Sequence, residues 1–304
     1  QEAIRSGRRA GPRIFPACGF IVPSWMNAFP QFLRVRTQDQ LERYLDHLIG
    51  LGATQVKNHL RRDPWVEAAT VKAAHRRGLP VQSHFIRPAS VAAGLDRKEH
   101  AFYYTLDGEA TARFQQDVVE IMQKAGITLD TTFIFPFMLT QKGQDRLNDA
   151  LSRNEISSFL PPAQIERIKR LLGRPIPEAL NLEWNRMLEA SKANAVAAHN
   201  AGVRVVVGTD FSNFLGFIAV HWEMEFLVEA GFSPLEALRA ATQDAATTLG
   251  LEGQLGSIVQ GAIADLVILE ADPLENIRNT QKIHSVIKDG NIIDRNALLE
   301  KKQK

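Results

Sequence analysis

Four side chains that could do chemistry follow short apolar stretches of the sequence: Lys57, His84, His100 and Asp210. The clearest case is VRVVVGTDFSN (residues 203–213), where valines typical of a buried parallel strand stop at Gly-Thr-Asp. In an α/β barrel the C-terminal ends of the strands meet at one mouth, so residues at four strand ends would converge. Each has an ordinary alternative: Asp210 as a helix cap, a histidine as a hydrogen-bonded core residue, Lys57 as a solvated side chain. Their agreement across four strands favours a shared site.

Two imidazoles and a carboxylate at such a mouth would suit a divalent metal of the zinc type. A metal there could activate a water near neutral pH, and Asp210 could accept the proton of that water. A metal-free alternative is a barrel enzyme in which Lys57 forms a Schiff base with its substrate.

Strand-like and helix-like segments alternate along the chain, which predicts a parallel sheet with crossover helices, either open or closed into a barrel. The predicted strands are 13–19, 53–58, 80–85, 97–103, 128–135 and 203–210. Helices are predicted from the capping box at Thr37 and Gln40 to Gly52, over 64–77 and 109–124, and from the capping box at Ser233 to about Leu249.

Two further regions stand apart from this alternation. Residues 139–201 are polar with helical periodicity, and we expect them to form a helical excursion over the mouth. The tail contains short β-runs at 256–273 and 283–294, the second interrupted by Asp289-Gly290, a strong hairpin signal. The tail therefore predicts a small β-unit appended to the α/β part.

Composition excludes several other classes. The 304 residues are 45% hydrophobic and carry a net charge of +2, with no broad basic field for nucleic acid. Cys18 is the only cysteine, so intrachain disulfides and thiolate clusters are excluded, and a buried apolar role is expected for it. No apolar run is long enough for a membrane span. These features predict a soluble protein with no membrane partner. A cytoplasmic location is favoured, and the composition is compatible with a homo-oligomer.

Longer motifs resemble the metal-dependent amidohydrolase superfamily in its imidazolonepropionase-like and prolidase-like branch. They are AVAAHNAGVRVVVGTD, HWEMEFLVEAGFSPLEALRAAT and LGLEGQLGSIVQGAIADLVILEADPLENI, with GATQVK, VQSH and KEHAFYY upstream. The resemblance implies a TIM-type (β/α)8 barrel with a small β-domain built from both chain ends. Residues 1–250 would form the barrel, and 251–304 the C-terminal part of the β-domain.

The resemblance also implies roles for the four strand-end residues. Asp210 looks like the last-strand aspartate that ligates metal and shuttles the proton, and His84 and His100 look like ligands of the second metal. Lys57 looks like the lysine that some branches carboxylate to bridge two metals. The implied activity is hydrolysis of C–N bonds in small amides, dipeptide-like compounds or cyclic amides, with one or two divalent ions, zinc above all. The alternative is a non-catalytic amidohydrolase-like module for binding or assembly.

The sequence departs from the family pattern at its beginning. No His-x-His motif occurs, and only six barrel strands are predicted, corresponding to strands 3 to 8. At roughly 30 residues per strand–helix unit, about 60 residues of barrel are absent. We expect open edges with exposed apolar faces at 13–19 and 203–210. We also expect a longer product whose upstream part carries His-x-His, and at most one weakly held metal in this chain alone.

Other polar residues receive simpler interpretations. His221, Trp222 and Glu223 match a family helix after the last strand, where packing and loop support are expected. His59, just past Lys57, is expected to be a surface residue.

Overall fold

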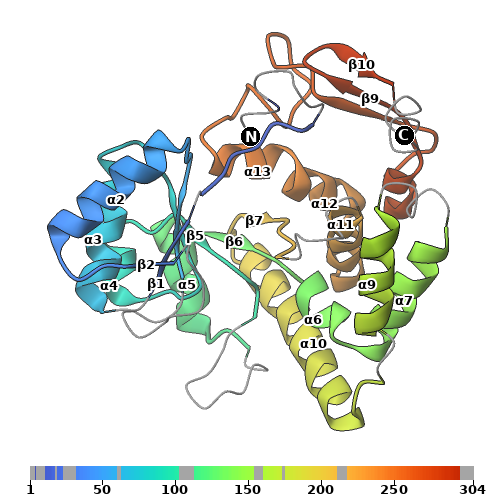
Figure 1. Cartoon of the computed structure of the whole chain (residues 1–304), viewed down its shortest axis with the longest axis horizontal. Coiled ribbons are helices and arrows are strands. Elements are labelled where there is room, and N and C mark those ends of the chain that lie inside the picture. The colour runs from blue at the N-terminus through green and yellow to red at the C-terminus, as the bar shows by residue number, and fades with distance from the viewer. Residues whose placement is uncertain are drawn as a thin grey trace.

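A seven-stranded parallel sheet forms the centre of the structure, a computed structural model (Figure 1). The structure describes residues 4, 11–17, 19–22, 32–59, 63–102, 113–153, 160–172, 175–210 and 218–294. The strand order is β2-β1-β3-β4-β5-β6-β7. The strands are β1 (Phe20–Val22), β2 (Phe32–Arg34), β3 (Val56–Asn58), β4 (Val81–Ser83), β5 (Arg97–Lys98), β6 (Thr128–Asp130) and β7 (Val205–Val206).

Helices connect these strands, as the alternation predicts. They are α2 (Gln38–Gly50), α3 (Pro64–His75), α4 (Pro88–Ala92), α5 (Gln116–Ala125), α6 (Ile134–Met138), α7 (Gln141–Ser152), α9 (Pro162–Leu172), α10 (Glu178–Asn200), α11 (Ala219–Ala230), α12 (Pro234–Ala241) and α13 (Gln243–Thr248). In Figure 1, α2, α3 and α4 form a layer on one side of the sheet, while α6, α10, α11 and α12 lie towards the other end. None of the helices in the described ranges is long and apolar enough to cross a membrane.

The helix caps confirm the boundaries that the sequence predicts. Thr37 caps α2 by accepting a hydrogen bond from the backbone of Gln40, and the leucine stripe of α2 is buried. At α12 both bonds of the capping box are present, because Ser233 and Glu236 each accept from the other's backbone. The helix predicted to continue to Leu249 is interrupted, since Thr242 is non-helical and separates α12 from α13.

The first predicted strand, 13–19, is wrong. The strand lies later, at β1, and the described residues 11–17 have no regular secondary structure. Pro16 explains the difference, because a proline lacks the N–H that a ladder needs. The segment still lies beside the residues that lead from α2 into β3, since Pro16 O accepts a hydrogen bond from the backbone N–H of Thr54 at 2.8 Å. Cys18 lies outside the described residues.

The sheet also contains one strand more than predicted. β2 pairs in parallel with β1, so β2 and β7 are the outer strands. Within the described residues no ladder joins β2 to β7, and the sheet is not closed by hydrogen bonds. The expected open edge at 203–210 is confirmed, but its expected exposure is wrong: Val205 and Val206 are buried. Helices α10, α12 and α13 contact β7 and cover it.

The stretch 139–201 is helical, as expected, but it is not all an excursion. Its last part, α10, contacts β7, α5 and α11 and serves as the crossover helix before β7. Within the described part of this stretch, α7 and α9 are the additions to the alternating pattern.

A second, antiparallel sheet contains β8 (Leu266–Leu269), β9 (Ile283–Lys288) and β10 (Asn291–Ile293), with the short helix η1 (Ile277–Gln281) between β8 and β9. The predicted hairpin is confirmed: Asp289 and Gly290 both have positive φ, at 50° and 79°, as a type I′ turn requires. Arg13 forms ion pairs with Asp265 and Asp289 and so attaches the N-terminal segment to this sheet. The small appended β-unit is therefore present.

Candidate active site

Strand register brings polar side chains to one face of the sheet. Lys57 is in register with Gln82, Gln82 with Arg97, and Arg97 with Thr128. Residues in register in a parallel sheet share a face, and so do residues two positions further along. The second row lies at the strand ends: His59, His84 and Glu99 directly follow β3, β4 and β5, and Asp130 is the last residue of β6.

The two predicted metal-binding histidines lie in contact. His84 Nε2 and His100 Nε2 are 3.1 Å apart, and the two rings meet edge to face. Two imidazole nitrogens bound to one tetrahedral zinc are about 3.3 Å apart, given zinc–nitrogen distances of about 2.0–2.1 Å. Burial, reinforced by the positive charge of Lys57, holds the pKa of both histidines well below its ordinary value. Both rings are therefore neutral at pH 7, which is the form that binds metal.

His100 reaches this position through an unusual backbone. Its φ of 66° is in the left-handed region, and only Glu99 separates it from the end of β5. The turn brings its ring towards His84, while Phe102 stacks on the ring with centroids 4.9 Å apart. His100 Nδ1 lies 2.9 Å from Thr132 Oγ1, in the turn after β6.

Lys57 is buried and paired with a carboxylate. Its Nζ lies 3.2 Å from Glu99 Oε2, and Arg97 holds the other Glu99 oxygen at 2.8 Å. Burial alone would raise the pKa of Glu99, but Lys57 and Arg97 together lower it to about 2. Glu99 is therefore ionised and fixes the Lys57 side chain at the mouth, the region where the C-terminal ends of β3 to β7 meet.

Asp130 is a second buried carboxylate at the mouth. Its Oδ1 has no hydrogen-bond partner among the described residues, and burial together with Glu99 raises its pKa to about 8. A Cβ atom on Gly208 would lie 2.0 Å from Asp130 Oδ1. The glycine that ends the valine run is therefore required, because the backbone just after β7 passes directly against this carboxylate.

Asp210 follows Gly208 on the same loop. It is exposed and has a left-handed φ of 46°. Partial loss of water raises the pKa of its carboxyl; Lys57 opposes this shift and Glu99 adds to it. An aspartate with a raised pKa is better matched to accepting and returning a proton near neutral pH.

Lys57 is the common electrostatic neighbour of His84, His100 and Asp210. The structure thus brings the four predicted residues to one end of the sheet, although only the two histidines contact each other directly. Within the described ranges no three His, Cys, Asp or Glu side chains converge on one metal position. The residues present fit two ligands of one tetrahedral ion, and the ligand roles of Lys57 and Asp210 stay predictions.

The structure corrects the expectation for His59. It is only partly exposed, and its ring lies edge-on against His84 with centroids 4.5 Å apart. The reason is that His59 N donates to Ile21 O at 3.0 Å, which extends strand geometry past Asn58 and turns His59 to the face of Lys57.

Sequence reasoning also missed Glu99 and Asp130. Asp130 was concealed because the predicted strand 128–135 continued through it, whereas β6 ends there. Ending that strand at its first carboxylate would have placed Asp130 with the other strand-end residues. Glu99 was visible only as the neighbour of His100.

His221 and Glu223 have the supporting roles expected of them. His221 Nδ1 lies 3.0 Å from Thr280 Oγ1 and links α11 to η1. Glu223 is fully buried and accepts hydrogen bonds from Thr131 Oγ1 at 2.8 Å and from Ile134 N at 2.6 Å.

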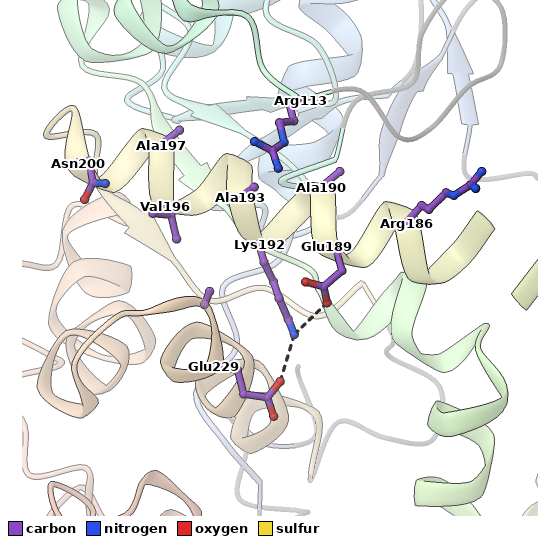
Figure 2. Close-up of a pocket in the computed structure, with 11 residues that line it drawn as sticks. Arg113, Arg186, Glu189, Ala190, Lys192, Ala193, Val196, Ala197, Asn200 and Glu229 are labelled. Atoms are coloured by element: carbon purple, nitrogen blue, oxygen red, sulfur yellow. Dashed lines mark hydrogen bonds and ion pairs between the residues drawn. The ribbon is translucent and has the colours of Figure 1, made fainter. Parts of the chain in front are cut away.

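One cavity of the structure is separate from these residues. It measures about 840 Å³ and lies along α10, as Figure 2 shows. Its central cation, Lys192, is already paired with Glu189 at 3.4 Å and Glu229 at 3.1 Å. None of the four predicted site residues lines this cavity, so it is not the candidate active site.

The parallel sheet with crossover helices and polar strand ends defines an α/β fold of the TIM-barrel type. The model of the amidohydrolase family matches residues 52–293, and the chain belongs to this family. Ochratoxinase of Aspergillus niger is 40% identical over 91 residues, which are 29% of this chain and 18% of that protein. Imidazolonepropionase of Haloarcula marismortui is 33% identical over 110 residues, 35% of this chain and 26% of that protein. The matched segments thus cover about a quarter or less of these relatives.

Solved structures show the same fold over nearly the whole chain. A putative prolidase from Bifidobacterium longum has a TM-score of 0.70 at 24% identity, covering 100% of this chain and 73% of that one. A. niger ochratoxinase has a TM-score of 0.69 at 19% identity, covering 96% of this chain and 68% of that one.

Proposed function

We propose that this chain contributes the active site of a metal-dependent hydrolase of carbon–nitrogen bonds. The observation that carries the proposal is the pair of neutral imidazoles, His84 and His100, whose Nε2 atoms face each other at 3.1 Å at the mouth. Membership of the amidohydrolase family supports the same chemistry.

His84 and His100 would hold one divalent ion, with zinc favoured by nitrogen ligands. Lys57, if carboxylated, and Asp210 would supply oxygen ligands beside them. The bound ion would polarise a carbonyl and lower the pKa of a water molecule.

Asp210 would carry the proton. Its exposed carboxylate lies on the loop after β7, where a substrate can reach it. It would accept a proton from the attacking water and return it to the leaving nitrogen, and its raised pKa favours both transfers.

The charge of Glu99 affects which chemical form of Lys57 is stable. While Lys57 is an ammonium group, Glu99 stabilises it at 3.2 Å. A carbamate on Lys57 would place two anions side by side, so we propose that carboxylation of Lys57 requires bound cations to offset Glu99.

The substrate would be a small amide, dipeptide-like or cyclic amide compound. The relatives support this range, since they include prolidases, one of them complexed with N-methylphosphonate-L-proline, and a Xaa-Pro dipeptidase. We further propose that residues 251–304 belong to a composite β-domain.

The test measures metal content, mass and hydrolysis together. The chain is loaded with zinc in bicarbonate buffer, and its metal stoichiometry and intact mass are compared with those of a His84→Ala, His100→Ala variant. Hydrolysis of Xaa-Pro dipeptides and of ochratoxin is then followed with the longest available form of the protein. We expect zinc bound by the unmodified chain, lost in the double variant, and zinc-dependent release of an amine. Equal zinc binding by both chains, or borohydride trapping of substrate on Lys57, would contradict the proposal.

A further inference from the structure

The loops that follow three neighbouring strands, β5, β6 and β7, each contain a residue with left-handed backbone: His100, Thr132 and Asp210, with φ of 66°, 55° and 46°. A positive φ is uncommon for residues other than glycine, and for a β-branched residue it is a genuine outlier. Thr132 is thus the most strained of the three. Glycine would adopt this conformation without strain, so the presence of threonine calls for a reason.

The surroundings of Thr132 hold it in this conformation. Its backbone N–H donates to Gly208 O at 3.1 Å, which ties the turn after β6 to β7. On the other side, Glu223 from α11 accepts from Thr131 Oγ1 and from Ile134 N, so the residues on both sides of Thr132 are fixed. The strained residue lies between two anchors, as such a conformation requires.

The side chain of Thr132 contacts the ring of His100. It is buried, with 2% of its surface exposed, and its Oγ1 lies 2.9 Å from His100 Nδ1. A histidine that binds metal through Nε2 almost always donates its other N–H to an oxygen, which fixes the tautomer and the ring orientation. Thr132 Oγ1 is in the position of that oxygen.

We propose that Thr132 is a positioning residue of the candidate metal site, held in left-handed backbone by Gly208 and Glu223 so that its hydroxyl orients the His100 ring. His100 Nδ1–H donates to Thr132 Oγ1, and the lone pair of Nε2 is left facing His84. The role of His100 as a ligand rests on the proposed function, whereas the tautomer of His100 is a property of the metal-free chain.

Two substitutions of Thr132 distinguish the effect of its hydroxyl group from the effect of its backbone strain. Thr132→Gly removes both, and Thr132→Ser keeps the hydroxyl on an unbranched side chain. If the Thr132 hydroxyl did not orient the His100 ring, Thr132→Gly would only relieve backbone strain. Stability and metal binding would then be unchanged or improved. If Thr132 is a positioning residue, Thr132→Gly should keep the stability of the chain but weaken its metal binding.

The experiment has two independent readouts. In the metal-free chain, imidazole ¹⁵N chemical shifts report the tautomer of His100; zinc affinity is then measured by titration with zinc alone. For Thr132→Gly we expect an undiminished thermal midpoint, a mixed His100 tautomer and zinc binding weaker by about 10–100-fold. Thr132→Ser should retain the tautomer and the affinity of the unmodified chain.

Asp289→Gly is the matched control. Asp289 also has a left-handed φ, 50°, but lies in the β9–β10 hairpin. Its replacement gives the same backbone relief and should leave zinc affinity unchanged. The inference is overturned if Thr132→Gly keeps both the His100 tautomer and the zinc affinity. If the unmodified chain binds no zinc, the proposed function fails, and the tautomer comparison alone decides whether Thr132 positions His100.

Discussion

The mouth of the parallel sheet and the small antiparallel sheet use side chains in opposite ways. At the mouth, charged groups are buried: Lys57 and Glu99 are 7% and 8% exposed. On the small sheet, apolar groups are exposed, with Val267 at 55% and Ile292 at 74%. Buried charge is costly unless it is paired, and an exposed apolar sheet contributes little to the stability of its own chain.

This contrast indicates where substitutions should matter. Interactions at the mouth should be sensitive to substitution, because they depend on pairs of atoms in contact and on residues with left-handed backbone. The small sheet is attached through the ion pairs of Arg13 and, by way of η1, through the contact between His221 and Thr280, while several of its apolar side chains are exposed.

The largest effect is expected at Asp210. Asp210→Asn keeps the shape of the side chain but removes the proton acceptor, and turnover should fall by about 10²–10⁴-fold. Steady-state hydrolysis by the zinc-loaded protein measures it. Asp145→Asn is the matched control, because Asp145 is exposed on α7 and accepts a hydrogen bond from the Gln141 side chain at 2.9 Å. Near-normal turnover in Asp210→Asn would remove this residue from the mechanism.

The close approach at Gly208 should be the next most sensitive. In Gly208→Ala the new Cβ would meet Asp130 Oδ1 at 2.0 Å, so the strand or the carboxylate must shift. We expect a loss of about 1–3 kcal/mol in the free energy of unfolding, measured by urea denaturation. At Gly50, the last residue of α2, an added Cβ meets nothing within 4 Å. A Gly50→Ala variant as destabilised as Gly208→Ala would contradict this interpretation.

Matched strand substitutions sharpen the comparison of the two sheets. Val205→Thr places a hydroxyl in the buried β7 strand, where it should cost about 1–3 kcal/mol. The same change at Val267 on β8 should alter the free energy of unfolding by no more than about 0.5 kcal/mol. Equal losses at the two positions would show that the small sheet is covered in solution.

A smaller effect concerns pH. Burial raises the pKa of Glu223 from 4.5 to about 8, against the hydrogen bonds from Ile134 and Thr131. As pH rises, the unfolded chain loses this proton before the folded chain does, so the stabilisation is complete below about pH 4.5 and is lost by about pH 8. Glu223→Gln should flatten the fall in the urea midpoint over that range. A slope equal to that of the unmodified chain would show that Glu223 is ionised throughout.

The sequence alone determined the class of fold and the positions of most candidate residues. Alternating strands and helices predicted a parallel sheet, capping boxes predicted where α2 and α12 begin, and apolar runs ending in Lys, His or Asp predicted four strand-end residues. These signals are local: each depends on a few neighbouring residues whose backbone preference or periodicity survives any tertiary arrangement.

Only the tertiary structure decided how these residues meet. The pairing of Lys57 with Glu99, the place of His59 beside His84 and the buried carboxylate of Asp130 depend on strand register and on where each strand stops. A strand end set a few residues too late, as at 128–135, conceals a carboxylate among core positions. The left-handed Thr132 has no signature in the sequence either, because its backbone is held by Gly208 and Glu223, which lie far along the chain and reach it only through folding.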